Sequence, residues 1–266
     1  MQLRIATYNI HKGVTSLTGR PRIHALKQAL TKLDVDLLFL QEVQGRHDRN
    51  AVRYAAHWPQ LGQHEYLADD LHHVAYGMNA VYDHGHHGNA LLSRFAIAST
   101  HNQDVSDHAY ESRGILHCAI DLGGVTVHCY VVHLGLFASG RQRQTDALID
   151  VVRSSVGPDV PVIIAGDFND WGNELSESLR SRLGVSEVFE HQADTSSLMT
   201  YLRKLGGMKP RAQTQPARTF PAALPLLRLD RIYLRGFQVE SAQVLQGGPW
   251  TSLSDHAPII STLRLT

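Results

Sequence analysis

The chain alternates short β-like segments with helical ones, and this alternation most limits the folds that it can adopt. Eight segments are rich in Ile, Val, Leu and Tyr and are bounded by Gly, Asp, Asn or Pro, a composition typical of β-strands. They span residues 3–8, 36–41, 89–93, 114–121, 125–133, 160–166, 229–234 and 258–263. Helical periodicity predicts helices between some of them, in residues 21–33, 142–153 and 174–183.

One pair of these strands is predicted to be antiparallel. Segments 114–121 and 125–133 flank the turn signal Leu122-Gly123-Gly124, which is typical of a β-hairpin. A two-residue loop would make Cys118 and Cys129 near neighbours on adjacent strands. We interpret these two cysteines as small buried apolar side chains in a reducing compartment.

A hairpin among interleaved strands and helices favours an α/β sandwich with mixed sheets over a purely parallel doubly wound fold. The sequence has no repeat period, no low-complexity tract and no linker-like break. We therefore expect a single domain over residues 1–266. Residues 206–225, rich in Gly and Pro, are expected to form a long functional loop rather than a domain boundary.

The overall charge limits the class of partner. Lys plus Arg and Asp plus Glu both number 25, so the formal net charge is zero. Proteins that grip long nucleic acid usually carry a basic excess, because neutralising phosphates releases counterions. Zero net charge therefore disfavours long duplexes but permits short or single-stranded substrates, and it leaves the oligomeric state open.

The N-terminal residues give no sign of a secretory signal, because no charged region precedes an apolar one. The longest apolar runs are far shorter than a bilayer requires, so no transmembrane segment is expected. Together with the two cysteines, these features predict a cytoplasmic protein.

Polar side chains of the kind that bind metals and phosphates stand at the ends of several predicted strands. Such side chains are easily satisfied at the edge of a core. Carboxylate and amide oxygens suit Mg²⁺ or Mn²⁺, and imidazoles exchange protons near neutral pH. The pattern predicts metal-assisted attack of water on phosphorus. The residues concerned are Asn9, Glu42, His133, Asp167, Asn169, Asp230, Asp255 and His256.

Each of these positions alone has a purely structural explanation. Asn9 could cap a turn, Glu42 could be a surface acid, and residues 166–169 could form an Asp/Asn turn. A Ser-Asp-His sequence before a strand could be a capping motif with a satisfied histidine. The functional interpretation rests on the joint pattern rather than on any one residue.

These motifs also resemble those of a known family. Their order and spacing are similar to those of the endonuclease/exonuclease/phosphatase superfamily, which has the fold of deoxyribonuclease I. The resemblance implies a four-layer α/β sandwich of two packed mixed β-sheets flanked by helices. Residues 87–94 and 219–221 also resemble the small bacterial members. The motifs are Tyr8-Asn9, Leu40-Gln41-Glu42-Val43, Gly166-Asp167-Phe168-Asn169, Leu229-Asp230-Arg231-Ile232 and Ser254-Asp255-His256-Ala257-Pro258.

The resemblance implies a metal site and a water-activating group. Glu42 would be the principal ligand of the metal ion, Mg²⁺ or Mn²⁺, with Asn9 and Asp255 beside it. Asp167 would orient or deprotonate the attacking water.

It also implies groups that hold the phosphate. Asn169 would hold a non-bridging phosphate oxygen, and His256, oriented by Asp230, would lie against the phosphoryl group. His133 would assist the leaving group. Arg113 would contact phosphate, or it would be a surface arginine.

The substrate class stays open between a nucleic-acid phosphodiester and a phospholipid or small-molecule phosphodiester. A non-catalytic binding module is disfavoured, because a pseudoenzyme should have lost one of the expected residues and none is missing. The basic stretch 201–235 could form a phosphate-binding rim or a solvated loop face. Its Phe220 could stack on a base, touch a lipid chain or pack the loop down. The histidines at 72, 73, 84, 86 and 87 match no standard zinc spacing and predict a polar loop.

Overall fold

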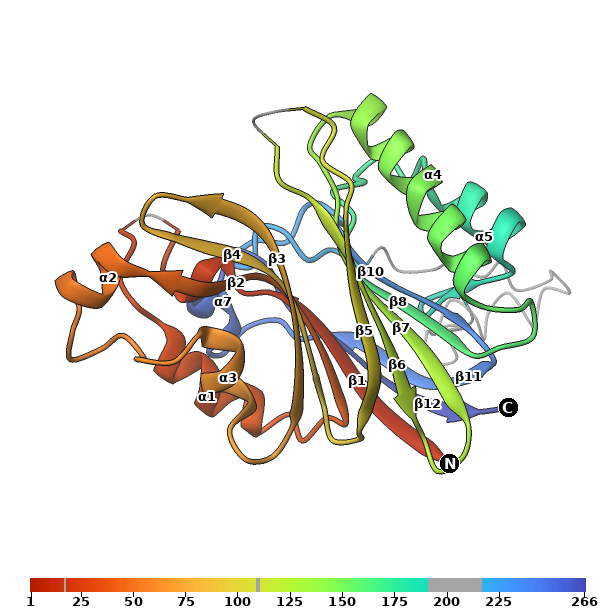
Figure 1. Cartoon of the computed structure of the whole chain (residues 1–266), viewed down its shortest axis with the longest axis horizontal. Coiled ribbons are helices and arrows are strands. Elements are labelled where there is room, and N and C mark those ends of the chain that lie inside the picture. The colour runs from red at the N-terminus through yellow and green to blue at the C-terminus, as the bar shows by residue number, and fades with distance from the viewer. Residues whose placement is uncertain (17, 109–110, 191–216) are drawn as a thin grey trace, which may run out of the picture.

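Two six-stranded sheets pack face to face in the computed structural model, which describes residues 1–16, 18–108, 111–190 and 217–266. Figure 1 shows the two packed sheets, with helices on the outer face of each. The first sheet has the order β11-β12-β1-β2-β4-β3 and the second the order β5-β6-β7-β8-β10-β9.

The first sheet comprises β1 (Gln2–Asn9), β2 (Leu37–His47), β3 (His73–Tyr82), β4 (Gly85–Ser93), β11 (Phe237–Val244) and β12 (Ile259–Leu265). The second comprises β5 (Ile97–Asp104), β6 (Gly114–Asp121), β7 (Thr126–His133), β8 (Val162–Asp167), β9 (Ser186–Glu187) and β10 (Asp230–Arg235). Strands β1 and β2 pair in parallel, as do β7 and β8, and the remaining pairs are antiparallel.

Strand alternation builds the layers. In β1, Leu3 and Ile5 point into the core between the sheets, whereas Ala6 and Tyr8 point to the outer face. Strand β8 repeats the arrangement: Ile163 lies in the core between the sheets, and its even-numbered neighbours pack outward. Each sheet therefore has two apolar faces and must be covered by helices.

Helices cover both outer faces. On the first sheet lie α1 (Ile23–Thr31) and α3 (Gln63–Ala68), and on the second lie α4 (Ala138–Ser155) and α5 (Ser176–Leu183). The apolar faces of α1 and α4 are buried against the sheets, and α5 ends at Gly184, which is in the left-handed conformation with φ of 64°. Three short helices complete the described chain: η1 (His11–Gly13), α2 (Asp48–Arg53) and α7 (Trp250–Leu253). This is the four-layer sandwich that the sequence predicted.

None of the helices within the described residues combines the length and the apolar character needed to cross a membrane.

The predicted hairpin is confirmed. Gly123 and Gly124 both have positive φ, at 69° and 95°, as the central residues of a type I′ turn require. Cys118 and Cys129 face each other across β6 and β7, and both are buried and free.

The strands that the sequence analysis missed are β3, β5, β9 and β11, and these are the four edge strands of the two sheets. Edge strands are half solvated, so they lack the apolar runs that mark a central strand. Strand β5, for example, reads IASTHNQD and has no buried residue. The prediction of a polar loop at residues 84–87 is also wrong, because His86 and His87 lie on β4.

We expect Gly166→Ala to destabilise the fold strongly. A Cβ atom at Gly166 would lie 1.9 Å from the carbonyl oxygen of Val132 on the neighbouring strand. The free energy of unfolding should fall by about 3 kcal/mol or more, measured by chemical denaturation. Gly123→Ala is the control: its Cβ meets nothing within 4 Å, so only the positive φ costs about 1–2 kcal/mol. Equal losses for the two variants would contradict this account.

Candidate active site

Strand alternation brings four of the predicted site residues to one end of the core between the sheets. Asn9, His133, Asp167 and Asp230 each continue the set of positions that point inward along their strands. The strand register aligns three of them, because Asp167 faces His133 across one ladder and Asp230 across the other. All four are at least nine-tenths buried.

A β-bulge brings Glu42 to the same place. Between Leu40 and Val43 the register of β2 against β4 shifts, so that two residues of β2 stand opposite Asn89 alone. Glu42 is in the left-handed region, with φ of 54°. This bulge changes the direction of the side chain, which regular alternation would have pointed outward.

The loop before β12 supplies two more of the predicted residues, Asp255 and His256. The Ser254 hydroxyl donates to the Asn9 carbonyl at 2.7 Å and so fixes this loop against the end of β1. Asp255 and His256 are the next two residues after Ser254 in the sequence. His256 is 6% exposed and reaches across to the second sheet.

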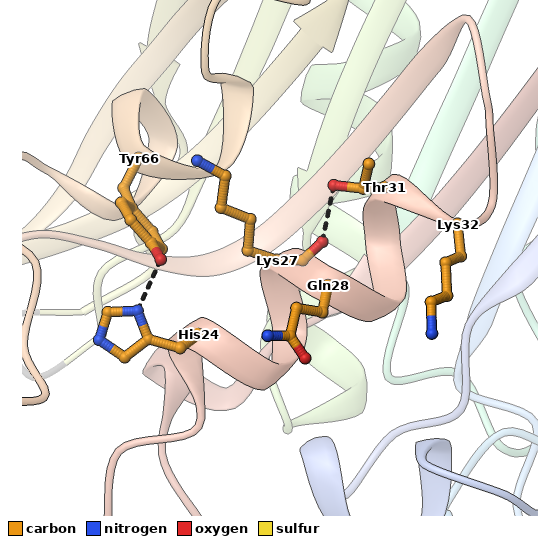
Figure 2. Close-up of a pocket in the computed structure, with 6 residues that line it drawn as sticks. All are labelled: His24, Lys27, Gln28, Thr31, Lys32 and Tyr66. Atoms are coloured by element: carbon orange, nitrogen blue, oxygen red, sulfur yellow. Dashed lines mark hydrogen bonds between the residues drawn. The ribbon is translucent and has the colours of Figure 1, made fainter.

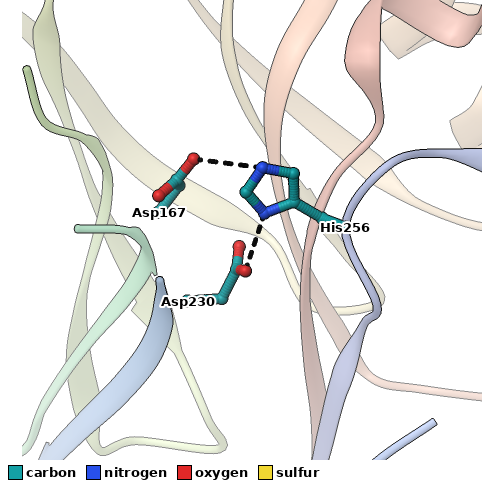
Figure 3. A group of neighbouring side chains, drawn as sticks. All are labelled: Asp167, Asp230 and His256. Carbon is teal, nitrogen blue, oxygen red and sulfur yellow. Dashed lines mark hydrogen bonds and ion pairs between the residues drawn. The ribbon is translucent and has the colours of Figure 1, made fainter. Parts of the chain in front are cut away.

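His256 lies between two buried carboxylates, as Figure 3 shows. Its Nδ1 is 2.8 Å from Asp230 Oδ2, and its Nε2 is 3.6 Å from Asp167 Oδ2. Burial alone would lower the pKa of His256, but the charges of Asp230 and Asp167 outweigh it and raise this pKa to about 10. Burial also raises the pKa of Asp167, to about 6, against the opposing effect of His256. The group therefore holds an imidazolium beside an Asp167 carboxylate between about pH 6 and pH 10.

Asn9 and Glu42 form the neighbouring part of the site. The Asn9 amide Nδ2 is 3.3 Å from Glu42 Oε1 and 3.1 Å from Asp167 Oδ2. Burial would raise the pKa of Glu42, but His133 and Lys12 outweigh it and lower this pKa to about 2. Asp255 stands beside them with its carboxylate 3.2 Å from His11 Nδ1.

The residues present fit a hard divalent cation. Asp167, Asp230 and His256 each offer a ligand atom, and within the described part of the chain these three form the one such group, with ligand atoms within 4.8 Å of one another. A second position is Glu42, whose Oε2 is buried and accepts no hydrogen bond, with the Lys12 ammonium 3.3 Å away. An ionised carboxylate oxygen in this state suits a cation.

Three further predicted residues surround the group. His133 Nε2 lies 3.6 Å from Asp167 Oδ2, and burial followed by Arg113 lowers the pKa of His133 well below its usual value. Asn169 donates one amide hydrogen to the Leu134 carbonyl at 2.8 Å. Arg113 is paired with Glu111 at 3.9 Å, so it is anchored rather than a freely solvated arginine.

Some contributors were missed by sequence reasoning. His11 pairs with Asp255, and Lys12 pairs with Glu42. Both residues have positive φ and follow the Tyr8-Asn9 motif within three positions, so this proximity was the available signal. The hydroxyl of Thr219 accepts from the backbone of Asp230.

Three arginines of the basic stretch 201–235, which could have formed a phosphate-binding rim or a solvated loop face, are instead paired within the protein. Arg231 is 1% exposed and pairs with Asp170, and Arg228 pairs with Glu187. Arg235 donates to the backbone carbonyls of three residues. Residues 203–211, which hold the remaining basic positions before Arg218, lie outside the described part of the chain.

Phe220 packs against the site. Its ring centroid is 5.1 Å from that of His256, and the two rings are tilted by 54°. The Phe220 ring is therefore packed beside the imidazole.

A cavity along α1 contains none of the predicted site residues. A cavity of about 750 Å³ lies along α1 and is lined by His24, Lys27, Gln28, Thr31, Lys32 and Tyr66, as Figure 2 shows. Its Lys27 is paired with Asp69 at 2.9 Å. None of its lining residues comes from the strand ends.

The model of the Endonuclease/Exonuclease/phosphatase family matches residues 6–256, which contain every residue of the group described above. The chain belongs to this family. Members of the endonuclease/exonuclease/phosphatase family are phosphoric ester hydrolases, and the buried Asp167, Asp230 and His256 group accords with that chemistry. The chain is 39% identical over 266 residues to the uncharacterized protein YbhP of Escherichia coli strain K12, covering 98% of this chain and 96% of that protein.

Solved structures agree on the fold of this family member. The endonuclease/exonuclease/phosphatase from Beutenbergia cavernae superposes with a TM-score of 0.73 at 19% identity, covering 99% of this chain and 72% of that one. The human Nocturnin catalytic domain superposes with a TM-score of 0.70 at 18% identity, covering 100% and 94%.

We expect His256 to keep its ring proton to unusually high pH in the metal-free protein. The titration midpoint should lie near pH 10 in the wild type and fall in Asp230→Asn, because burial then opposes the charge with one partner fewer. Since the folded pKa is above the unfolded value, the stability that this ring contributes is complete below pH 6.5 and is lost as pH rises through about 10. Imidazole NMR signals against pH measure the midpoint. A wild-type midpoint near 6.5 would contradict the assignment.

Proposed function

We propose that the chain is a Mg²⁺- or Mn²⁺-dependent phosphodiesterase that cleaves its substrate by attack of an Asp167-oriented water on phosphorus. The observation that supports this most is the surroundings of one atom. Asp167 Oδ2 is 3.1 Å from Asn9 Nδ2 and 3.6 Å from the Nε2 atoms of both His133 and His256. A carboxylate, an amide and two imidazoles thus share one buried spot.

Asp167 is the base of the proposed reaction. Its pKa, raised by burial to about 6, leaves it ionised at neutral pH yet more basic than an exposed aspartate. The other carboxylate oxygen of Asp167, Oδ1, accepts a hydrogen bond from the backbone N–H of Asn169 at 3.0 Å. This bond holds the carboxylate in one orientation. The water's proton moves to Asp167 as the water oxygen bonds to phosphorus, the P–O bond to the leaving alcohol breaks, and the leaving oxygen takes up a proton from solvent.

His256 and Asn169 bind the phosphoryl oxygens. The imidazolium is fixed by Asp230 and offers its Nε2–H toward the site, where it neutralises an anionic phosphate. The Asn169 amide has a second hydrogen available after its bond to Leu134. His133 would assist the leaving group, and Arg113 would contact phosphate from the rim.

Glu42, with Asn9 and Asp255 beside it, would hold the cation. When bound, the cation supplies Lewis-acid polarisation of the phosphate. Without the cation, Lys12 pairs with Glu42 and His11 pairs with Asp255, and these pairs reduce the repulsion between the two carboxylates.

The substrate proposed is a nucleic-acid or nucleotide phosphodiester, with a phospholipid or small-molecule phosphodiester as the alternative. Residues 1–266 are taken as one catalytic domain of a cytoplasmic protein. A panel of bis(p-nitrophenyl) phosphate, abasic DNA, single-stranded DNA and glycerophospholipids, each with Mg²⁺, Mn²⁺ or chelator, separates these classes. No hydrolysis of any member with either metal would count against the proposal.

Asp167→Asn and His256→Ala should each lower kcat on bis(p-nitrophenyl) phosphate by roughly two orders of magnitude or more, because each removes a proton acceptor or a phosphate-binding charge. The fold should stay intact by circular dichroism. Asp150→Asn, an exposed aspartate on α4 with a side chain 77% exposed, is the matched control and should keep wild-type turnover. Near-normal kcat in either site variant would refute its role.

Glu42→Gln should raise the Mg²⁺ concentration needed for half-maximal activity by roughly tenfold or more, because an amide is a much weaker cation ligand than a carboxylate. A Mg²⁺ titration of initial rates measures the effect. An unchanged midpoint would mean that the cation is held elsewhere, for example by Asp167 and Asp230.

A further inference from the structure

Thr219 lies where two segments of the site meet, and it is fully buried there. Its hydroxyl oxygen accepts a hydrogen bond from the backbone N–H of Asp230 at 3.3 Å and a longer one from that of Leu229 at 3.4 Å. Its carbonyl oxygen accepts from the backbone N–H of Ala257, the residue after His256, at 2.8 Å. Thr219 therefore binds both of the segments that carry the Asp230–His256 pair drawn in Figure 3.

The strand register explains why the Asp230 backbone needs this hydroxyl. Asp230 stands opposite Asp167, and the adjoining bond runs from the Phe168 N–H to the Leu229 carbonyl at 2.9 Å. Asp230 and Asp167 are therefore a non-hydrogen-bonded pair, so the Asp230 N–H points away from β8. On that side β9 pairs with residues further along β10. The Thr219 hydroxyl supplies the acceptor that a longer neighbouring strand would have provided.

The Asp230 carboxylate depends on its backbone for its position. Its Oδ2 is 2.8 Å from His256 Nδ1, whereas its Oδ1 is buried and has no hydrogen-bond partner among the described residues. The bond from the Asp230 N–H to Thr219 therefore helps to decide where the carboxylate points. A buried N–H left without a partner costs free energy, so loss of the hydroxyl would favour a different position of Asp230.

The loop that begins at Thr219 also holds His256. Within this loop, the backbone N–H of Ala222 donates to the Asp255 carbonyl at 2.7 Å, and the Thr219 carbonyl accepts from Ala257 at 2.8 Å. These two bonds lie on either side of His256 in the sequence, so they fix the backbone that carries the imidazole. The imidazole and its carboxylate partner are thus positioned by one loop.

We propose that Thr219 is a positioning residue for the reaction: its hydroxyl holds the Asp230 backbone and its carbonyl holds the His256 loop, so that the two side chains stay paired. The proposal rests on the proposed function, which gives His256 its contact with the phosphate. Thr219 acts through these two residues rather than on the substrate. The hydroxyl at this position should therefore matter more than the shape of the side chain.

Thr219→Val and Thr219→Ser separate the hydroxyl from the shape, because valine lacks the hydroxyl and serine lacks the methyl group. In the metal-free, full-length protein, the Nδ1 proton of His256 should exchange with water roughly tenfold faster in Thr219→Val than in the wild type, since a bond that holds its acceptor is lost. In Thr219→Ser the exchange rate should stay within about twofold of the wild type. Proton NMR of the imidazole N–H signals measures the rate, and loss of the signal in His256→Ala assigns it.

Ser93→Ala is the matched control. Ser93 is equally buried, and its hydroxyl accepts from the backbone N–H of Phe95 at 3.0 Å, but it ends β4 opposite Leu37, away from the site. This variant loses the same kind of hydrogen bond, so it should be destabilised without a change in the exchange of the His256 proton. If Thr219→Val does not fold, Thr219→Ala serves as the variant without a hydroxyl.

Two outcomes of the exchange measurement would overturn the proposal. One is an unchanged rate in the variant without the hydroxyl. The other is an equal rise in that variant and in Thr219→Ser or Ser93→Ala, because the effect would then follow from packing alone.

Turnover keeps the two proposals distinguishable. On bis(p-nitrophenyl) phosphate, Thr219→Val should lower kcat about tenfold and change KM by less than about twofold, because a misplaced imidazolium loses most when charge builds up in the transition state. Thr219→Ser should restore kcat. Absence of hydrolysis by the wild type would refute the proposed function, while the exchange rates would still decide whether Thr219 holds the pair. Wild-type kcat in Thr219→Val would refute the positioning role with the proposed function intact.

Discussion

The polar contact between the two sheets is the interaction on which the site depends. Asn9 and His256 belong to the first sheet or to the loop that enters it, whereas Asp167 and Asp230 belong to the second. The bonds from Asn9 to Asp167 and from His256 to Asp230 therefore cross the core at one of its ends. A shift of one sheet over the other would separate the carboxylates from the imidazole. The apolar packing between the two sheets therefore fixes the distances within the polar group at the end of the core.

Backbone strain gathers at the same end. Seven described residues other than glycine have positive φ, and four of them, His11, Lys12, Glu42 and Asn169, belong to the site, with φ between 44° and 57°; the other three are Asp34, Asp69 and Asn173. Such conformations cost free energy and persist only where the surrounding structure imposes them. Here they direct side chains into the site: His11 and Lys12 toward Asp255 and Glu42, Glu42 toward the core, and the Asn169 amide toward the Leu134 carbonyl.

Buried charges serve two separate purposes in this fold. Arg231 pairs with Asp170 at 3.5 Å, and Asp170 also accepts from the backbone at Glu174 and Leu175. That pair fixes the chain after β8, and its charges are matched. Glu42 is also charge-paired, because its Oε2 lies 3.3 Å from the Lys12 ammonium, but this oxygen accepts no hydrogen bond and no backbone group fixes it.

Much of this protein follows from the sequence alone. Periodicity located the central strands and three main helices, because buried strands and amphipathic helices leave an apolar pattern. The strand-end motifs picked out residues that the structure brings together at one end of the core, since polar side chains closing apolar strands are unusual enough to be informative together. The edge strands β3, β5, β9 and β11 left no such pattern and were found only in the structure.

Only the tertiary structure decided how these residues are arranged. Glu42 reaches the site through a bulge that regular alternation would not predict, and Lys12 and His11 join it through a strained turn. The arginines of β10 are part of the structural framework rather than a phosphate rim, because their partners come from segments far away in sequence. The sequence determined which groups are present, whereas charge pairing and burial, which depend on distance in space, determined what each group can do.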